Sequence, residues 1–318
     1  MKNWLAAGAL ALGMGMTATG AFAQTTTVPG EQVGLATGAP LPEGIYALNT
    51  FTYRRTDPAN SPDTAVNIPV LVWATPFVPF GGRVELLVAP PTVFAFTRNP
   101  AGVANRDISI NVGTFVGGIW AFDLGNNFGI SLLGGVYLND LNGDRGSLGI
   151  GLAGTPVLPQ LSSNTYRAGV AASYTGEGYN LTANLTGNFY DSSGRFGGRV
   201  GGAIGPLVIS DSLNLDLTAT KKFDLFNQGK PRFEFGAVGY GTVNVGDAAA
   251  IVGRGGRFAL GGLIGYDFGP FTAQIYVARD VVTSVAGTES TDGWFRIIAP
   301  LYSPTPAAPA PAPLVRKY

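Results

Sequence analysis

The segment GYNLTANLTGNFYD, residues 178–191, alternates between apolar and polar side chains along almost its whole length. Successive side chains of a β-strand point to opposite faces, so the alternation predicts a strand with one apolar and one polar face. The polar face consists of Asn and Thr, whereas the water-facing side of a soluble sheet usually carries Lys and Glu. The two faces therefore need two different surroundings, and these surroundings decide the fold class.

The composition favours a protein that crosses a membrane with strands. Only 13% of the 318 residues are charged, whereas a typical soluble domain contains about 25%. Beyond residue 25, no apolar run reaches the roughly 18 residues that a transmembrane helix needs. A high apolar content without such a run is what alternating membrane strands produce, and the 47 glycines fit a curved sheet.

The chain contains no cysteine and no histidine. Their absence excludes thiol nucleophiles, Ser-His-Asp hydrolysis, disulfides and the usual zinc sites. The formal net charge is zero, which argues against nucleic acid as a partner. We therefore predict that the protein is not an enzyme and that it has no cofactor and no metal.

The first residues are typical of a secretory signal peptide. Lys2 supplies the positive start, residues 5–16 form an apolar stretch, and residues 21–23 read AFA, a typical cleavage site. We predict cleavage near Ala23, so that the mature chain begins near Gln24. A membrane anchor is the alternative, but the apolar stretch is short and ends in small residues.

Twelve stretches of the mature chain are long enough to cross a bilayer at a tilt, which takes about 9–11 residues. They span residues 44–55, 65–78, 83–97, 107–122, 128–138, 164–175, 179–190, 211–221, 232–243, 257–268, 271–280 and 293–302. The alternation is clearest in the fourth and in the seventh to eleventh. The first three are weaker, with prolines at positions 69, 76, 90 and 91, and their registers stay open.

The connections between these stretches alternate in length. On one side they are mostly short, at residues 79–82, 123–127, 176–178 and 269–270, with a longer one at 222–231. On the other side they are long, at residues 56–64, 98–106, 139–163, 191–210, 244–256 and 281–292. Short periplasmic turns and long outer loops are typical of bacterial outer-membrane barrels, and an even strand number places both chain ends on the periplasmic side.

Charge placement supports an all-β fold, an antiparallel transmembrane β-barrel of twelve strands over residues 44–302. In the seventh to eleventh stretches the apolar row carries no charge before Arg279, and a charge facing lipid would cost roughly 2–4 kcal/mol at the bilayer midplane. Aromatic residues near strand ends are expected to form interfacial girdles, at Trp120, Tyr174, Phe189, Tyr266, Phe268 and Trp294. The apolar row is thus predicted to meet lipid and the Asn/Thr row to face a lumen. A secreted double-sheet sandwich is the alternative, and it would need a more charged outer face.

Polar and charged residues in the inward row are candidates for lining the lumen. They are Glu85, Asp107, Asn111, Arg167, Asn184, Asp216, Glu234, Arg257, Gln274 and Arg296. The charged ones could line a permeation path, or they could pair across the lumen and hold it closed, and the sequence leaves both open. Asp216 and Glu234 lie on neighbouring predicted strands. At one level they would need a cation such as Arg257 nearby, because an unpaired buried carboxylate would protonate.

Two motifs suggest ligands but lack the required context. The glycine pattern GIGLAG, residues 149–154, has no strand before it, no helix after it and no suitably placed acidic residue, as a dinucleotide site requires. The segment DLNGDRG, residues 140–146, opens like a calcium loop, but Arg145 replaces its glycine and Gly151 its bidentate glutamate. We interpret both as parts of a long loop.

Several segments resemble a known family. NLDLTATKKF (214–223), FEFGAVGY (233–240), FALGGLIGYDFGP (258–270) and GWFRIIAPLY (293–302) are similar to the family named for the meta-pathway of phenol degradation, and LPEGIYALNTFTYRRTD (41–57) is similar to its first strand. The likeness runs from about residue 31 to residue 302. It implies an outer-membrane barrel related to channels for hydrophobic compounds, often described simply as transporters. The family name reflects a genetic association with aromatic degradation, so it fixes no substrate, and no site residue is carried over.

The chain departs from that family after Tyr302, where barrels of this kind usually end. Residues 303–318 are rich in Pro and Ala and cannot pair in a sheet, so we expect a flexible periplasmic tail. A tether to the cell wall or to a partner is the alternative.

A twelve-stranded barrel falls between the eight-stranded kind, which side chains fill, and the sixteen- to eighteen-stranded kind, which holds an aqueous channel. Residues 24–43 form a periplasmic segment or fold into the lumen as a plug. We therefore expect a channel in the outer membrane of a Gram-negative bacterium, for passive uptake of small hydrophobic or aromatic compounds. A small-solute or ion porin and a structural outer-membrane protein are the alternatives. The expected partners are outer-membrane lipid, the barrel-assembly machinery and the solute.

Overall fold

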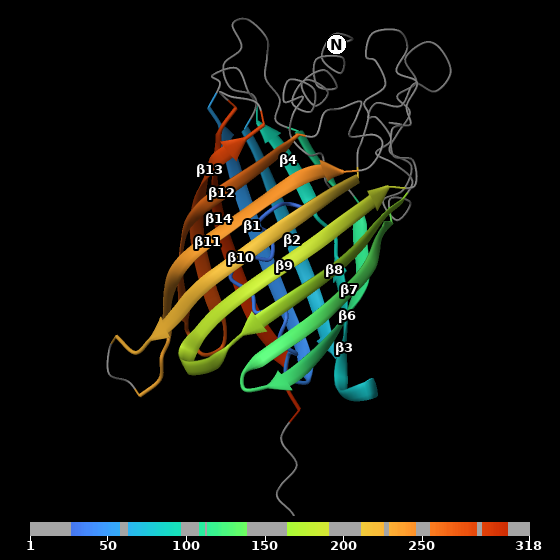
Figure 1. The fold of residues 1–318 in the computed structure, drawn as a ribbon, viewed down its shortest axis with the longest axis vertical. Coiled ribbons are helices and arrows are strands. Elements are labelled where there is room, and N and C mark those ends of the chain that lie inside the picture. The colour runs from blue at the N-terminus through green and yellow to red at the C-terminus, as the bar shows by residue number, and fades with distance from the viewer. Residues whose placement is uncertain are drawn as a thin grey trace, which may run out of the picture.

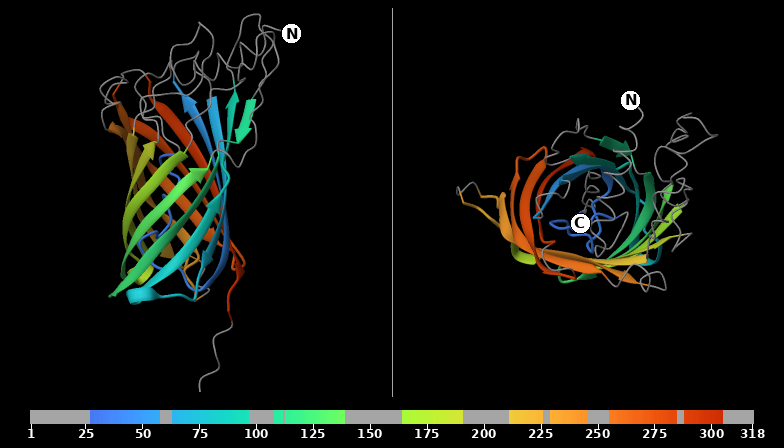
Figure 2. Two further views of the ribbon diagram at one scale, coloured as in Figure 1. Left: turned by 90° about the vertical axis from the view of Figure 1, so that its right-hand side faces the viewer. Right: turned by 90° about the horizontal axis from the view of Figure 1, so that it is seen from above.

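The computed structural model describes residues 27–57, 63–96, 108–111, 113–138, 164–190, 211–225, 229–245, 255–284 and 288–304. Several predicted features lie outside these ranges: the signal peptide, Asp107, the loop motifs at 140–146 and 149–154, and the tail beyond Pro304. The described residues form a closed antiparallel β-barrel of twelve strands, as predicted (Figures 1 and 2). None of the helical stretches in this part of the chain has the length and hydropathy that crossing a bilayer requires.

The wall of the barrel consists of fourteen strand segments. They are β1 (Gly44–Thr56), β2 (Asp63–Ala74), β3 (Gly82–Ala89), β4 (Thr92–Phe96), β5 (Ile108–Asn111), β6 (Thr114–Gly125), β7 (Phe128–Leu138), β8 (Asn164–Tyr174), β9 (Tyr179–Tyr190), β10 (Asp211–Phe223), β11 (Phe233–Val245), β12 (Gly256–Asp267), β13 (Thr272–Thr283) and β14 (Ser290–Tyr302). Two short 3₁₀ turns, η1 (Pro79–Gly81) and η3 (Gly176–Gly178), connect β2 to β3 and β8 to β9.

The barrel closes because the last strand pairs with the first. β14 runs antiparallel to β1, with Tyr302 opposite Ile45, and β1 also pairs with β2 from Gly44 to Arg54. A closed sheet has no free edge, so its strands satisfy their backbone hydrogen bonds without water. The start of β1 and the end of β14 lie together at the end of the barrel that carries η1 and η3 (Figure 1).

Two of the predicted strands are interrupted, so that fourteen segments make twelve crossings. The stretch 83–97 is divided into β3 and β4 by Pro90 and Pro91, and the stretch 107–122 is divided into β5 and β6 just before Thr114. Proline has no N–H and cannot donate to a ladder, which explains the first interruption. The prediction of one continuous strand in each stretch is therefore wrong.

The interruption between β3 and β4 lies opposite the middle of β2. Residues 71–74 of β2 pair with β3 and residues 63–67 pair with β4. On this side, residues 68–70 therefore face the Pro90–Pro91 break, whereas on their other side they pair with residues 48–50 of β1. The hydrogen-bonded ladder of the wall is locally interrupted at this place.

The two faces of the strands meet different surroundings, as the alternation predicts. In β9, Leu185 points outward and is 43% exposed, whereas Asn184 points inward and is 5% exposed. The same contrast runs through β10, where buried and more exposed residues alternate along the strand. The apolar row thus forms the outer surface of the barrel, where lipid would lie, and the Asn/Thr row faces the lumen.

Aromatic side chains gather on the outer surface near the short turns, as the girdle prediction requires. The ring centroids of Trp120 and Phe122 lie 4.7 Å apart, and those of Tyr266 and Phe268 also lie 4.7 Å apart. Trp294 is an exception, because it belongs to the inward row, is 2% exposed and stacks on Tyr276 at 5.1 Å. Its assignment to a girdle is therefore wrong, since a position near a strand end does not by itself decide the face.

Residues 27–41, here called the luminal segment, lie inside the barrel (Figure 2). The segment is a succession of tight turns, in which Glu31, Val33 and Leu35 each donate their N–H to the carbonyl oxygen three residues earlier, at 2.9, 3.2 and 3.2 Å. Such turns satisfy only part of the backbone, so the remaining N–H and C=O groups need partners from the barrel wall.

Candidate functional site

Inward side chains of β9, β10, β13 and β14 bind the luminal segment, five of them at its backbone and Asn184 at the side chain of Gln32. We call this set of residues the polar wall: Asn180, Asn184, Asp216, Thr218, Gln274 and Arg296. Asp216 supplies the carboxylate of the polar wall. One of its oxygens accepts from the N–H of Gly30 at 2.9 Å, and the other accepts from the N–H of Gln32 at 3.0 Å. Two charge-assisted hydrogen bonds thus fix the first turn of the segment.

Arg296 is the cation of the polar wall and is fully buried. Its guanidinium donates to the carbonyl oxygens of Glu31 and Val33, and its Nε donates to Thr50 Oγ1 at 2.9 Å. Asp216 therefore holds amide groups of the luminal segment and Arg296 holds its carbonyl groups. Together they bind the polypeptide backbone from both of its polar sides.

Gly34 shows how closely the luminal segment fits this wall. Its N–H donates to Thr218 Oγ1 at 2.8 Å, and its carbonyl accepts from Asn180 at 3.1 Å and from Gln274 at 3.2 Å. Its φ is +84°, and a Cβ at this position would lie 2.8 Å from the Leu263 side chain. Only glycine combines this left-handed conformation with so close an approach.

The second half of the luminal segment is held by other strands. The N–H of Gly38 donates to Ser173 Oγ at 2.9 Å, and the carbonyl of Thr37 accepts from Ser131 Oγ at 2.7 Å. The carboxylate of Glu85 accepts from the N–H of Leu41 at 2.7 Å. The polar inward side chains therefore bind a peptide backbone, which explains why they are Asn, Thr, Ser and Gln rather than rows of charges.

The opposite side of the lumen is apolar. Here the inward side chains of β2, β3, β6 and β7, which we call the apolar wall, are Ile68, Val70, Val72, Leu87, Ala89, Phe115, Ile119, Leu133 and Tyr137. Between this wall and the luminal segment lies a cavity of about 130 Å³, whose lining also includes Glu31, Leu35, Arg167 and, from the polar wall, Asn184. The lumen thus has one side that binds the luminal segment and one side that leaves room beside it.

Arg167 of β8 lies where the two sides meet. Its guanidinium pairs with the Glu31 carboxylate of the luminal segment at 2.7 Å and donates to the Tyr137 hydroxyl at 2.7 Å. The same group lies 4.7 Å from the centre of the Phe115 ring and 4.9 Å from that of Tyr137. A buried ion pair and two aromatic rings therefore border the apolar cavity.

Eight of the ten predicted lumen residues have described side chains, and all eight are buried and point inward: Glu85, Arg167, Asn184, Asp216, Glu234, Arg257, Gln274 and Arg296. Asn111 lies in β5, where the structure describes only its backbone, and Asp107 lies outside the described residues. Arg167 and Asn184 border the cavity and also contact side chains of the luminal segment. The other contacts to the segment, at its backbone, come from Glu85, Asp216, Gln274 and Arg296.

Arg257 does not pair with Asp216 or Glu234. It pairs instead with Asp280 at 3.4 Å and with Asp292 at 2.5 Å, in a buried group that Arg54 joins at 2.8 Å. Asp216 is satisfied by backbone N–H groups, and Glu234 accepts from Thr220 and Gln274. Asp216 lies opposite Tyr240 and Glu234 lies opposite Lys222, so the two carboxylates are not at one level. The condition under which they would need a cation such as Arg257 is therefore not met, and neutral donors satisfy both.

The sequence prediction missed the apolar wall, because it searched the inward row for polar residues. A usable signal exists: residues 70–73 read VLVW and residues 132–133 read LL, so apolar side chains occupy both rows. Such stretches mark places where the lumen itself is apolar. Among the described residues, no group of three or more acidic side chains is placed to hold a metal ion.

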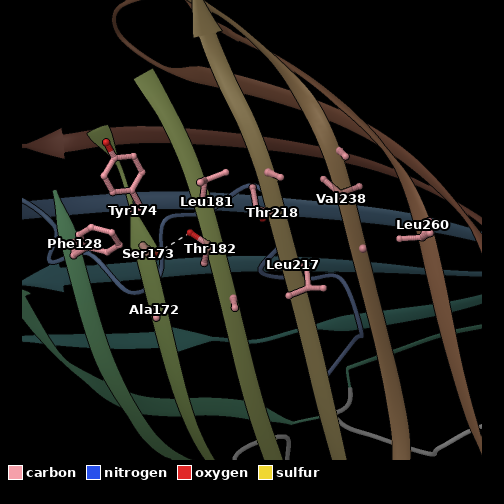
Figure 3. Close-up of a pocket in the computed structure, with 14 residues that line it drawn as sticks. Phe128, Ala172, Ser173, Tyr174, Leu181, Thr182, Leu217, Thr218, Val238 and Leu260 are labelled. Atoms are coloured by element: carbon pink, nitrogen blue, oxygen red, sulfur yellow. Dashed lines mark hydrogen bonds between the residues drawn. The ribbon is translucent and has the colours of Figure 1, made fainter. Parts of the chain in front are cut away.

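A second hollow lies on the outer face of the barrel and does not belong to the lumen. Figure 3 shows it bordered by Phe128, Leu181, Leu217 and Leu260, which point away from the luminal segment. Thr182 and Ser173, behind it, point inward and are joined by a hydrogen bond of 2.7 Å. The hollow is a feature of the lipid-facing surface.

No protein-family model and no curated protein matches this chain. An outer membrane channel from Pseudomonas putida F1 is similar in structure, with a TM-score of 0.58 and 14% identity over 86% of this chain and 99% of that chain. A FadL homologue from Pseudomonas aeruginosa (TM-score 0.46, 12% identity, 88% of this chain and 98% of that chain) and the CymD monoaromatic hydrocarbon channel (0.44, 7%, 81% and 88%) score too low to carry an argument. At this identity the first similarity shows the fold alone, and this chain therefore has the barrel fold of an outer-membrane channel.

Proposed function

We propose that this protein is an outer-membrane channel for the passive uptake of small hydrophobic or aromatic compounds. The observation that carries the proposal is the apolar cavity between the luminal segment and the apolar wall. A wall of Ile, Val, Leu and Phe is unfavourable in a water-filled pore, because exposing these side chains to water costs about 25 cal/mol per Å². An apolar solute gains the same free energy by entering.

The size of the cavity suits one small ring. Its volume is about 130 Å³, and an apolar cavity of about 150 Å³ in another protein stays dry and binds benzene. The lining contains the side chains of Phe115 and Tyr137, whose ring centroids lie 5.0 Å apart, and the branched side chains of Ile68 and Leu133. Offset aromatic contacts and aliphatic packing both favour a monocyclic aromatic solute.

The proposed location follows from the fold and from the predicted export signal. A closed barrel with an apolar outer surface requires lipid around it, and a cleaved signal near Ala23 would direct it through the inner membrane. We propose that the barrel-assembly machinery inserts it into the outer membrane of a Gram-negative bacterium. Residues 303–318 would then extend into the periplasm, since Tyr302 lies at the short-turn end.

The interrupted ladder offers a route between the cavity and the membrane. Ile68, Val70 and Ala89 line the cavity and flank the Pro90–Pro91 break. The eight residues of β3 before the break climb about 20 Å at the usual rise and tilt, which lies within the apolar band of about 25 Å. A solute that entered from the outside would pass beside the luminal segment, and one that moved sideways would leave through this break.

The porin alternative has less support. Polar inward side chains such as Asp216 and Arg296 are engaged by the luminal segment and do not line open water. A conducting pore would first have to release this segment. Steady single-channel conductance of the refolded full chain in a planar bilayer, in steps that scale with salt, would favour the porin over our proposal.

The proposal is tested by uptake of radiolabelled toluene into cells that lack other channels for hydrophobic compounds. Cells that produce the protein should take up toluene several-fold faster than cells with an empty vector. The double variant Pro90→Val/Pro91→Val restores ladder donors and should slow uptake towards the empty-vector rate. Pro300→Val is the matched control, because it makes the same change in β14, where Pro300 lies opposite Tyr46 of β1 beside a register shift and away from the cavity. Heat-dependent electrophoretic mobility confirms folding, and equal toluene uptake with and without the protein would overturn the proposal.

A further inference from the structure

The ion pair between Arg167 and Glu31 at the edge of the cavity suggests a more specific substrate class. We infer that Arg167 binds the carboxylate of a small aromatic acid, which takes the place of Glu31 and releases the luminal segment from this side of the lumen. The inference rests on the proposed function and names the substrate class of the same cavity.

Arg167 is held by the barrel independently of Glu31. Its Nη2 donates to the Tyr137 hydroxyl at 2.7 Å, and the guanidinium lies over the rings of Phe115 and Tyr137. Glu31 reaches it from the luminal segment, with one carboxylate oxygen 2.7 Å from Arg167 Nη1. The cation would therefore keep its position if another carboxylate replaced that of Glu31.

Charge balance favours a monocarboxylate over other ligands. Both partners of the pair are buried, with side chains 5% and 8% exposed. Removing one partner of a buried pair leaves an uncompensated charge, which is strongly unfavourable. A ligand carboxylate exchanges for the Glu31 carboxylate without changing the charge of the site, whereas a neutral solute or a cation cannot do so. An aromatic acid would in addition place its ring in the apolar cavity next to the guanidinium.

Glu31 also joins the two sides of the lumen. Its side chain reaches Arg167 on β8, while its backbone carbonyl accepts from Arg296 on β14. The N–H groups of Gly30 and Gln32, on either side of it, bind Asp216 on β10. Displacing the side chain would remove the attachment of the segment to the apolar side, so the cavity would widen. The segment would then rest on the polar wall alone and separate from it more readily, which would expose Val33.

The test compares benzoate with toluene, because the two differ by a carboxylate in place of a methyl group. Binding to the refolded full chain in detergent is measured by equilibrium dialysis. Release of the segment is measured by the rate at which a thiol reagent modifies the variant Val33→Cys, since Val33 is fully buried and the natural chain has no cysteine. Benzoate should accelerate modification by on the order of tenfold, the scale of one charge-assisted hydrogen bond, and toluene should not.

Three variants assign the effect to the pair. Arg167→Gln should lower the ratio of benzoate to toluene affinity by about tenfold or more, because it removes the cation. Glu31→Gln should raise that ratio by a similar factor, because it removes the competing carboxylate. Glu43→Gln is the matched control. It removes a carboxylate that also lies before β1 but does not line the cavity, so the ratio of benzoate to toluene affinity should not change. The double variant Glu31→Gln/Arg167→Gln keeps the site neutral and shows whether a loss in Arg167→Gln comes from the unpaired Glu31.

The outcomes separate this inference from the proposed function. If toluene binds but the benzoate-to-toluene ratio is the same in all variants, the inference fails and the hydrophobic channel stands. If benzoate binds but does not accelerate modification of Val33→Cys, the displacement of Glu31 is wrong. If neither compound binds, the proposed function fails as well.

Discussion

The two sides of the lumen use the same strand geometry for different purposes. On the polar wall, Asp216 and Arg296 bind the backbone of the luminal segment through hydrogen bonds from several strands. On the apolar wall, Leu87 and Leu133 border a cavity of about 130 Å³ beside the same segment. Each hydrogen bond to a charged group contributes about 1.5–3 kcal/mol and is directional. Contacts with an apolar surface are not directional, so they do not fix the orientation of the segment. The first side therefore positions the segment and the second side leaves space for a solute.

The comparison also explains the unusual composition of the inward row. A peptide backbone offers alternating N–H and C=O groups, and neutral side chains such as Thr218 and Gln274 satisfy them without adding charge to a buried site. Lys and Glu would leave buried charges wherever the backbone could not neutralise them. The Asn/Thr pattern is thus suited to binding a segment of protein rather than to facing bulk water.

The largest expected effect comes from removing the cation of the polar wall. Arg296→Gln loses the donors to the Glu31 and Val33 carbonyls, so binding of the luminal segment should weaken by about 3 kcal/mol, roughly a hundredfold. In the background of Val33→Cys, thiol modification should accelerate accordingly. Arg296→Lys keeps the charge but not the planar fork, so its modification rate should lie between that of the natural Arg296 and that of Arg296→Gln. Unchanged modification rates in Arg296→Gln would show that the polar wall does not hold the segment.

A smaller effect is expected on the apolar wall. Leu133→Ala removes methyl groups that border the cavity, which should cost about 1–2 kcal/mol of stability and enlarge the space for solute. The affinity for naphthalene relative to toluene should rise in equilibrium dialysis, while thiol modification of Val33→Cys should stay as it was. Leu132→Ala is the matched control, because Leu132 is the outward neighbour and is 48% exposed. Equal gains in both variants would mean that the cavity does not select solutes by size.

The smallest effect is expected outside the lumen. Arg279 and Asp57 form an ion pair at 2.6 Å, but their side chains are 54% and 44% exposed. Such pairs contribute about 0–1 kcal/mol, so Arg279→Gln should hardly change the temperature at which the barrel loses its folded electrophoretic mobility. Solute binding and thiol modification should also be unaffected. A large drop in that temperature would show that the outer rim of the barrel depends on this pair.

Much of the wall could be predicted from local sequence. The stretches 128–138 and 179–190 agree with β7 and β9 at both ends, because a short turn precedes each of them and a long connection follows. The interrupted strands could not be predicted in the same way. Pro90 and Pro91 predict a break in the strand. Whether the chain continues across the barrel wall after them depends on the pairing of β4 with β2. Pairing between distant strands is not encoded in any short window of sequence.

The candidate site was predictable only in part. Inward polar residues such as Asp216 and Arg296 follow from the two-residue period, but their partners do not. Asp216 binds Gly30, which lies 186 residues away in the sequence, and Arg257 pairs with Asp292 rather than with Asp216 or Glu234. The partners of these side chains depend on the registers of several strands and on where residues 27–41 lie.

By itself, the sequence determined the alternating strands, the uncharged outer face and the polar inner row. These features are local, because side-chain direction repeats every two residues and a charge facing lipid is costly wherever it lies. The tertiary structure decided that the polar row binds a backbone and that an apolar cavity lies opposite. The reason is that the closure of the barrel brings residues 27–41 against strands from the whole chain, and only this arrangement shows which inward side chains find a partner and which leave space.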